Sequence, residues 1–325
     1  MKKSKFLFGF VFLLVGCSGV KDSAQSVVSP VIDSSATSEG IDTSTSNPAI
    51  QGNLVITPQF ETASRFSEGL AAVGVGGQWG FIDKSGKMVI NPQFDSVYGF
   101  SEGLAAVDVG GRQSGFIDRS GKMVINPQFD FAYSFSEGLA AVQVGDQMGF
   151  IDKSGKMVIT PQFDSAQPFS DGLSVVQVGG QSGFIDKSGK MVITPQFDFA
   201  YSFRGGFAAV QVGGQSGFID KSGKMVITPQ FGDAYSFSGG LAAVVVGGRF
   251  GFIDKSGKMV ITPQFVDAFS FSEGLAAVRV RVGDRIGFID RSGNMVITPQ
   301  FESIYPFSEG LAAVLVGDKW GYISK

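Results

Sequence analysis

The chain has 325 residues, of which 43% are hydrophobic, 17% are charged and 46 are glycines, and its formal charge is -3. This composition supports a large core and many turns rather than long surface helices, so we expect an all-β protein. The lack of His and the single Cys exclude an intrachain disulfide and remove the commonest metal ligand, so we expect no metal site and no cofactor.

The charge also bears on the kind of partner. Removal of a leader that carries three lysines and no acidic residue would take the formal charge from -3 to -6. The rest of the chain has no basic block, so we expect no nucleic-acid partner.

Residues 1–17 have the layout of a bacterial secretory signal. A basic start is followed by an apolar run from Phe6 to Val15, which is too short to span a membrane. The ending Leu-Val-Gly-Cys resembles the lipobox of bacterial lipoproteins, which implies lipidation of Cys17 and an anchor in the cell envelope. By the same resemblance, Ser18 in place of Asp favours the outer membrane; an ordinary secretory leader is the alternative.

Residues 18–50 are rich in Ser and Thr and carry only scattered apolar residues. Such a segment buries too little surface to offset its ordering entropy, so we expect a disordered tether.

Residues 51–325 form an array of eight similar units. The motif Pro-Gln-Phe recurs at steps of 34 to 36 residues, with its proline at positions 58, 92, 127, 161, 195, 229, 263 and 299. Self-similarity at this spacing is typical of a solenoid or a propeller.

Each unit predicts three strands. In the fourth unit these are Met157 to Phe163, Leu173 to Val178 and Gly183 to Asp186. Paired glycines supply the hairpin between the second and third strands, and the turn Asp-Lys-Ser-Gly leads into the first strand of the next unit. Because Pro161 cannot donate to a ladder, we expect its strand to bend, bulge or lie at an edge, and to leave the sheet there.

The two ends of the array favour closure. The first unit begins at Gly52 without an upstream partner strand, and the chain ends with a third strand at Trp320 to Lys325. These ends are complementary halves of one hairpin, so we predict a closed, eight-bladed, propeller-like ring. An open β-solenoid or superhelix is the alternative, although it would expose both edges.

The unit Gly-Phe-Ile-Asp-Lys-Ser-Gly-Lys-Met-Val-Ile-x-Pro-Gln-Phe resembles the bacterial WG, or KWG, repeat, and the resemblance covers about residues 53–325. The Trp that gives the repeat its name occurs only at Trp79 and Trp320. The other units place Ser114, Met148, Ser182, Ser216, Phe250 and Ile286 before the Gly. The resemblance implies a repeat protein without catalytic activity and with an interaction-type function.

The conserved positions within the array predict structure. Phe recurs three times per unit, which predicts a repeated aromatic core. Asp recurs after Phe-Ile, where we expect it to cap the turn; the residues are Asp83, Asp118, Asp152, Asp186, Asp220, Asp254 and Asp290. A glycosidase would need one of these Asp to pair with the Glu of a Phe-Ser-Glu-Gly turn. Because the copies are nearly identical, turn capping is favoured over a single catalytic pair.

The positions at which units differ are the candidate binding surface. Tyr and Trp on a rigid scaffold often bind partners, and basic residues cluster at the hairpin tips. The candidate residues are Trp79, Trp320, Arg249, Arg279, Arg281, Arg285, Lys319, Tyr98, Tyr133, Tyr201, Tyr235 and Tyr305. For Trp79 and Trp320 the alternative is that they seal the ring by packing. We therefore expect a membrane-anchored envelope scaffold that binds proteins, with a glycan- or cell-wall-binding module as the alternative and an envelope glycosidase third.

Overall fold

The computed structural model describes residues 52–111 and 113–325, and these residues are all β, as predicted. They belong to one compact unit, Asn47–Lys325. The predicted signal peptide at 1–17, Cys17 and the tether at 18–50 lie outside the described residues. No helix among the described residues is long and apolar enough to cross a membrane.

The described strands form eight four-stranded antiparallel sheets, called blades 1 to 8 here. From the innermost to the outermost strand, blade 1 holds β2 (Thr62–Ala63), β3 (Leu70–Val75), β4 (Gln78–Asp83) and β5 (Met88–Phe94); blade 2 holds β6 (Ser96–Val97), β7 (Leu104–Val109), β8 (Gln113–Asp118) and β9 (Met123–Phe129); blade 3 holds β10 (Phe131–Ala132), β11 (Ala140–Val144), β12 (Gln147–Ile151) and β13 (Met157–Phe163); blade 4 holds β14 (Ser165–Ala166), β15 (Ser174–Val178), β16 (Gln181–Ile185) and β17 (Met191–Phe197).

The remaining blades repeat this order. Blade 5 holds β18 (Phe199–Ala200), β19 (Phe207–Val212), β20 (Gln215–Asp220) and β21 (Met225–Phe231); blade 6 holds β22 (Asp233–Ala234), β23 (Leu241–Val246), β24 (Arg249–Asp254) and β25 (Met259–Phe265); blade 7 holds β26 (Asp267–Ala268), β27 (Ala276–Arg279), β28 (Ile286–Ile289) and β29 (Met295–Phe301); blade 8 holds β30 (Ser303–Ile304), β31 (Leu311–Val316), β32 (Lys319–Ser324) and β1 (Asn53–Phe60).

The prediction of three strands per unit was wrong, because each blade has a fourth, innermost strand of two residues. In blade 4 this strand is β14, which pairs through Ser165 and Ala166 with β15. The grouping also changes, because the turn after Asp186 joins β16 to β17 inside one blade, where Phe184 faces Ile193. The Met-to-Phe strand is therefore the outermost strand of a blade rather than the first strand of the next.

The proline in each outermost strand sits in a bulge. In blade 4, Ser182 faces Phe197 and Phe184 faces Ile193, so β17 carries extra residues around Pro195. A Cβ at Gly183, opposite this bulge, would lie 2.6 Å from the Ile193 carbonyl oxygen and 2.7 Å from the Pro195 nitrogen. The prediction of a bulge at an edge is confirmed, but the strand does not leave its sheet, because it pairs again at Phe197.

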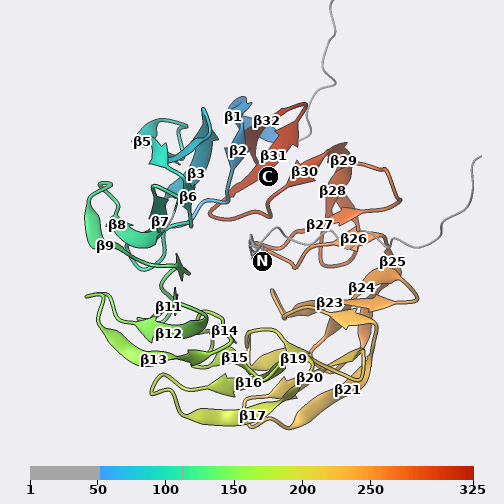
Figure 1. Cartoon of the computed structure of the whole chain (residues 1–325). Coiled ribbons are helices and arrows are strands. Elements are labelled where there is room, and N and C mark those ends of the chain that lie inside the picture. Colours follow the sequence, from blue (N-terminus) through green and yellow to red (C-terminus); the bar gives the residue numbers. More distant parts are fainter. Residues whose placement is uncertain (1–51, 112) are drawn as a thin grey trace, which may run out of the picture. The chain divides into compact units, whose positions relative to one another are not determined.

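The first and last strands of the array close the ring. β1 is the outermost strand of blade 8 and pairs antiparallel with β32, with Asn53 opposite Ser324 and Phe60 opposite Trp320. Figure 1 shows the blades arranged around a ring, with blue β1 beside red β32. The protein is a closed β-propeller, which confirms the ring and excludes the open superhelix.

The core lies between neighbouring blades. Phe184 of blade 4 packs on Phe203 of blade 5 with ring centroids 4.8 Å apart, and the same tilted pair recurs around the ring. At the seam, Tyr322 replaces the Phe and packs on Phe66 at 4.9 Å. These rings are almost fully buried, so the predicted aromatic core is confirmed.

Candidate functional site

The two faces of the ring carry different loops. Successive strands of a blade are antiparallel, so its connections alternate between the faces. One face, called the tip face here, holds the hairpins between the second and third strands, such as Gly179–Gly180, and the crossovers to the next blade. The other, called the turn face, holds the Ser-Glu-Gly turns and the Asp-Lys-Ser-Gly turns.

The five predicted tyrosines follow the innermost strands and are all half-buried. The structure brings them together in groups rather than in a continuous rim. Tyr98 and Tyr133 have ring centroids 6.1 Å apart, and Tyr201 and Tyr235 have centroids 5.5 Å apart. Tyr305 packs on Trp320 at 5.4 Å within blade 8.

Tyr201 of the group in blades 5 and 6 lines a hollow of about 190 Å³, called the aromatic pocket here, and Tyr235 packs beside Tyr201. Its lining includes Phe199, Tyr201, Gln211, Ser216 and Asp233. Gln211 and Ser216 lie beside the hairpin tip of blade 5, which places the pocket on the tip side. The ring of Phe199 is 48% exposed, and it contacts Tyr201 edge-on at 4.9 Å.

The phenols of Tyr201 and of its neighbour Tyr235 stay protonated at neutral pH. Burial, followed by the charge of Asp233, raises the pKa of Tyr201 to about 12. Burial and Asp233 likewise raise the pKa of Tyr235. Neutral phenols beside the carboxylate of Asp233 and the amide of Gln211 can donate hydrogen bonds to the backbone of a partner and accept hydrogen bonds from it.

Both tryptophans lie in blade contacts. Trp79 is half-buried against a cluster that contains Phe94 and Val97, and Trp320 packs beside Phe60 and Tyr305. They belong to blades 1 and 8, which flank the seam. Trp320 packs at the ring closure, whereas the cluster around Trp79 joins blade 1 to blade 2, so the sealing interpretation fits Trp320 and not Trp79.

The predicted basic residues do not gather into one patch. Arg249 donates weakly to the Val280 carbonyl at 3.5 Å, and Arg281 is exposed. Arg285 donates to the Gln300 carbonyl at 3.0 Å and lies 3.6 Å from the Glu302 carboxylate.

The other two cations are partly enclosed. Arg279 lies opposite Asp267 in the strand register, and its buried Nε has no hydrogen-bond partner among the described residues. The pKa of Glu61 is lowered mainly by hydrogen bonds from the backbone N–H groups of Gly77 and Gly76. The charge of Lys319 in blade 8 lowers this pKa by a smaller amount.

The Asp after each Phe-Ile caps its turn, as predicted. Asp186 Oδ1 accepts from the Ser188 N–H at 2.9 Å, the Ser188 hydroxyl at 2.6 Å and the Lys190 N–H at 3.1 Å. The serine hydroxyl is the largest cause that lowers the pKa of this carboxyl.

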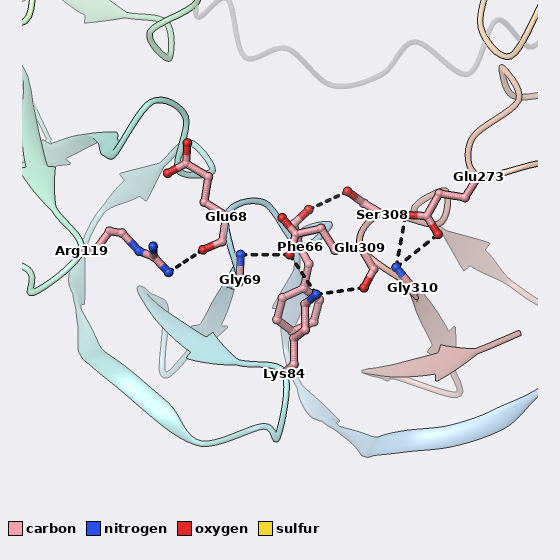
Figure 2. Close-up of polar contacts among 9 residues, drawn as sticks. All are labelled: Phe66, Glu68, Gly69, Lys84, Arg119, Glu273, Ser308, Glu309 and Gly310. Atoms are coloured by element: carbon pink, nitrogen blue, oxygen red, sulfur yellow. Dashed lines mark hydrogen bonds and ion pairs between the residues drawn. The ribbon is translucent and has the colours of Figure 1, made fainter.

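The turn face carries a chain of contacts that the sequence reading missed, called the belt here. Figure 2 shows it at the seam, where the Glu309 carboxylate accepts from the Gly69 N–H at 2.9 Å and pairs with Lys84 at 3.1 Å. Lys84 also donates to the Glu309 carbonyl at 3.0 Å, and Ser308 donates its hydroxyl to the Phe66 carbonyl at 2.7 Å. The belt thus joins blade 8 to blade 1.

The belt repeats wherever the turn has an acidic residue. Each such residue accepts from the glycine N–H of the following blade, and all six adopt a left-handed φ of 51° to 55°: Glu68, Glu102, Glu137, Asp171, Glu273 and Glu309. Blades 5 and 6 have Gly205 and Gly239 at this position. The sequence signal was the change from Ser-Glu-Gly to Arg-Gly-Gly and Ser-Gly-Gly in these two units.

Comparison with known families finds matches along the whole array. The family described as WG containing repeat matches residues 50–79, 79–112, 115–147, 148–181, 183–215, 217–250, 250–281 and 286–320. No curated protein matches the chain.

Several solved structures share the fold at low sequence identity. The computationally designed Ika8 protein has a TM-score of 0.57 and 11% identity, over 85% of this chain and 98% of its own. A eukaryotic initiation factor has a TM-score of 0.54 and 13% identity, over 82% and 83%. BamB from Moraxella catarrhalis has a TM-score of 0.51 and 11% identity, over 83% and 97%.

Proposed function

The chain belongs to the family of WG-containing repeats, and from that premise we propose that it is a non-enzymatic scaffold that binds protein partners at the bacterial cell envelope. The observation that carries the proposal is the aromatic pocket. Phe199 is exposed beside the neutral phenol of Tyr201 and the carboxylate of Asp233, on a closed ring of eight blades. Rigid aromatic groups with a few polar neighbours are typical of protein-binding surfaces.

The carboxylates that a glycosidase would use are occupied in structural roles. The turn aspartates cap backbone N–H groups, as Asp186 does. The belt carboxylates accept from the next blade, as Glu309 does from Gly69. Both arrangements support a scaffold rather than a hydrolase.

The positions of the tryptophans weigh against a glycan-binding module. A sugar platform needs an open aromatic face, whereas Trp79 and Trp320 are half-buried in blade contacts. The rings of Phe199 and Tyr201 stand at 79° to each other, so the pocket presents no flat aromatic platform and suits an irregular protein surface better than a flat sugar.

A photoreactive amino acid at position 199 tests the protein-binding proposal. In intact bacteria that express the full chain, we expect defined protein adducts from position 199. The matched control places the same group at exposed Ser222 on the turn face. The absence of adducts at 199, or the same adducts from both positions, would contradict the proposal.

The anchor is proposed on the lipobox-like ending at Cys17. Metabolic labelling with an alkyne-tagged fatty acid should mark the parent chain and leave a Cys17→Ser variant unlabelled, and fractionation should place the parent in the outer membrane. An equally labelled Cys17→Ser variant would overturn the anchor without affecting the test at position 199.

A further inference from the structure

The belt is interrupted on the turn face between blades 5 and 7, whereas the contact of Asp171 in blade 4 with Gly206 in blade 5 is intact. At this place, called the gap site here, Arg204-Gly205-Gly206 and Ser238-Gly239-Gly240 replace the Ser-acidic-Gly turns of the other blades. A hollow of about 420 Å³ lies there, lined by residues that include Arg204, Gly239, Gly240 and Lys255. The gap site therefore combines a missing acidic side chain with a recess large enough for one.

The other blades show how a carboxylate sits at this position. Glu102 accepts from the Gly138 N–H at 3.1 Å and pairs with Lys153 at 3.1 Å. At the seam Glu309 has the same two donors at 2.9 and 3.1 Å. The chain thus contains its own template for binding a carboxylate between a glycine N–H and a lysine.

At the gap site the donors remain although the acceptor is gone. Lys255 donates to the Gly205 carbonyl at 2.7 Å, as Lys84 does to Glu309, but it has no carboxylate within ion-pair distance among the described residues. The Gly240 N–H, which corresponds to Gly69, makes no hydrogen bond to a side chain within the described part of the chain.

The next blade repeats this arrangement. Arg291 reaches Gly239, since a Cβ there would lie 3.0 Å from its guanidinium nitrogen. The Gly274 N–H likewise has no side-chain acceptor in residues 52–111 and 113–325. Two neighbouring carboxylate positions are therefore open, each with one backbone donor and one cation.

The charge of the gap site favours an anion. Arg204 adds a cation where all seven other blades have serine, and it is exposed. The carboxylate in the lining is Asp171, which is held by the Gly206 N–H at 2.8 Å. Exposed cations beside unpaired N–H groups form a site for an acidic group.

Relief of backbone strain explains only part of the sequence change at the gap site. Gly205 and Gly239 have φ of 60° and 61°, where glycine is less strained than glutamate. Relief of strain accounts for the glycines, but it does not account for Arg204 or for the retention of Lys255 and Arg291.

We propose that the gap site binds carboxylates of an acidic segment of a partner protein. One ligand carboxylate accepts from the Gly240 N–H and pairs with Lys255 and Arg204, in the place that Glu309 holds at the seam. A second carboxylate takes the equivalent place between Gly274 and Arg291. This surface is on the turn face, so it goes beyond the aromatic pocket of the tip face.

A binding experiment with the full chain tests this assignment. The probe is fluorescein-labelled hexaglutamate, followed by fluorescence polarisation at low salt, with labelled hexaglutamine as the uncharged control. The decisive variant is Gly205→Glu with Gly239→Glu, which completes the belt with the chain's own carboxylates. We expect this variant to bind hexaglutamate about tenfold more weakly than the parent, because the ligand loses one or more charge-assisted contacts.

The completed belt should fold, because its geometry already exists in six other turns. The added Cβ at position 205 meets the mobile end of Lys255 at 3.1 Å rather than backbone. Gly205→Gln with Gly239→Gln is the matched control that adds the same bulk without charge, and Arg204→Ser restores the serine of the other turns. We expect the Gln variant to bind hexaglutamate more tightly than the Glu variant does. Arg204→Ser should bind hexaglutamate more weakly than the parent chain does.

The outcomes separate the possibilities. Equal affinity of parent and Gly205→Glu/Gly239→Glu for hexaglutamate would overturn the gap site. Displacement of hexaglutamate by inorganic phosphate at lower concentration than by free hexaglutamate would assign the site to small anions and overturn the acidic partner. Because the aromatic pocket is tested by crosslinking at position 199, failure of one proposal leaves the other standing.

Discussion

At the scale of single residues, the glycine before each Phe-Ile is dictated by the bulge opposite it. A side chain at Gly183 would collide with the backbone of the bulged strand around Pro195, and no rotamer change can relieve a clash with backbone. The two most repeated features of the unit, the glycine and the proline, are therefore one structural element.

Gly183→Ala should be destabilising by about 1 to 3 kcal/mol, because the strand pair must separate to admit one methyl group. Urea unfolding followed by tryptophan fluorescence measures the loss. Gly232→Ala is the matched control, since its Cβ would meet its nearest neighbour, the Val245 carbonyl oxygen, at 3.6 Å in ordinary contact. Equal stability of the two variants would contradict the collision.

Tyr322 gives the seam a polar contact that the Phe of other blades cannot make. Its hydroxyl donates to the Ser64 carbonyl at 2.8 Å while its ring is fully buried. Tyr322→Phe should cost about 1 kcal/mol and lower the melting temperature. Tyr305→Phe serves as the control, because no hydrogen bond of its hydroxyl occurs among the described residues; a larger effect there would count against the seam bond.

Sequence reasoning succeeded at this scale where the partners are local. The capping of the turn by Asp186 involves residues two and four positions away, and the repeated Phe follow from periodicity. The belt was missed because Glu68 bonds to Gly103 in the next blade, and nothing in the local pattern links a strained glutamate to a glycine one unit away.

At the scale of strands, the unit was recognised but divided at the wrong place. The innermost strands have two residues, too few to show alternation, so the pattern of apolar residues could not reveal β14. The pairing of β1 with β32 could be predicted because the two chain ends are halves of a hairpin that the other units contain intact.

Removal of residues 52–60 should destabilise the whole domain, because β32 then lacks its outer partner and blade 8 becomes an exposed edge. We expect a lower melting temperature by calorimetry. A synthetic peptide of residues 52–60 added in trans should raise it again in proportion to peptide concentration. A peptide with reversed sequence is the control; the same melting temperature with and without β1 would show that closure contributes nothing.

At the scale of the whole molecule, many carboxyl groups around the ring have their pKa lowered by small local contacts, and together these contacts make the stability of the fold depend on pH. Hydrogen bonds from serine hydroxyls and backbone N–H groups lower the pKa of the turn aspartates, Asp83 among them. For Glu309, burial acts in the opposite direction but is outweighed by Lys84 and Gly69, so its pKa is also lowered. Burial raises the pKa of Asp267, which opposes the trend at one site.

These shifts predict acid sensitivity. A carboxyl whose pKa is lower in the folded state stabilises the protein above its unfolded pKa, about 4, and this contribution is lost as pH falls through the lower folded value. The melting temperature should therefore be nearly constant between pH 6 and 8, where the chain has no His to titrate, and fall below about pH 4. A fall that begins at pH 6 would contradict this account.

The pairing of β1 with β32 also imposes an order on folding. β1 is synthesised before the rest of the array and its partner β32 after it. Phe60 can therefore pair with Trp320, and blade 8 can form, only when both ends of the array are present. Contacts so distant in sequence close slowly. An incomplete or clipped polypeptide cannot complete the ring, so closure acts as a check that the entire array has been made before the propeller is finished.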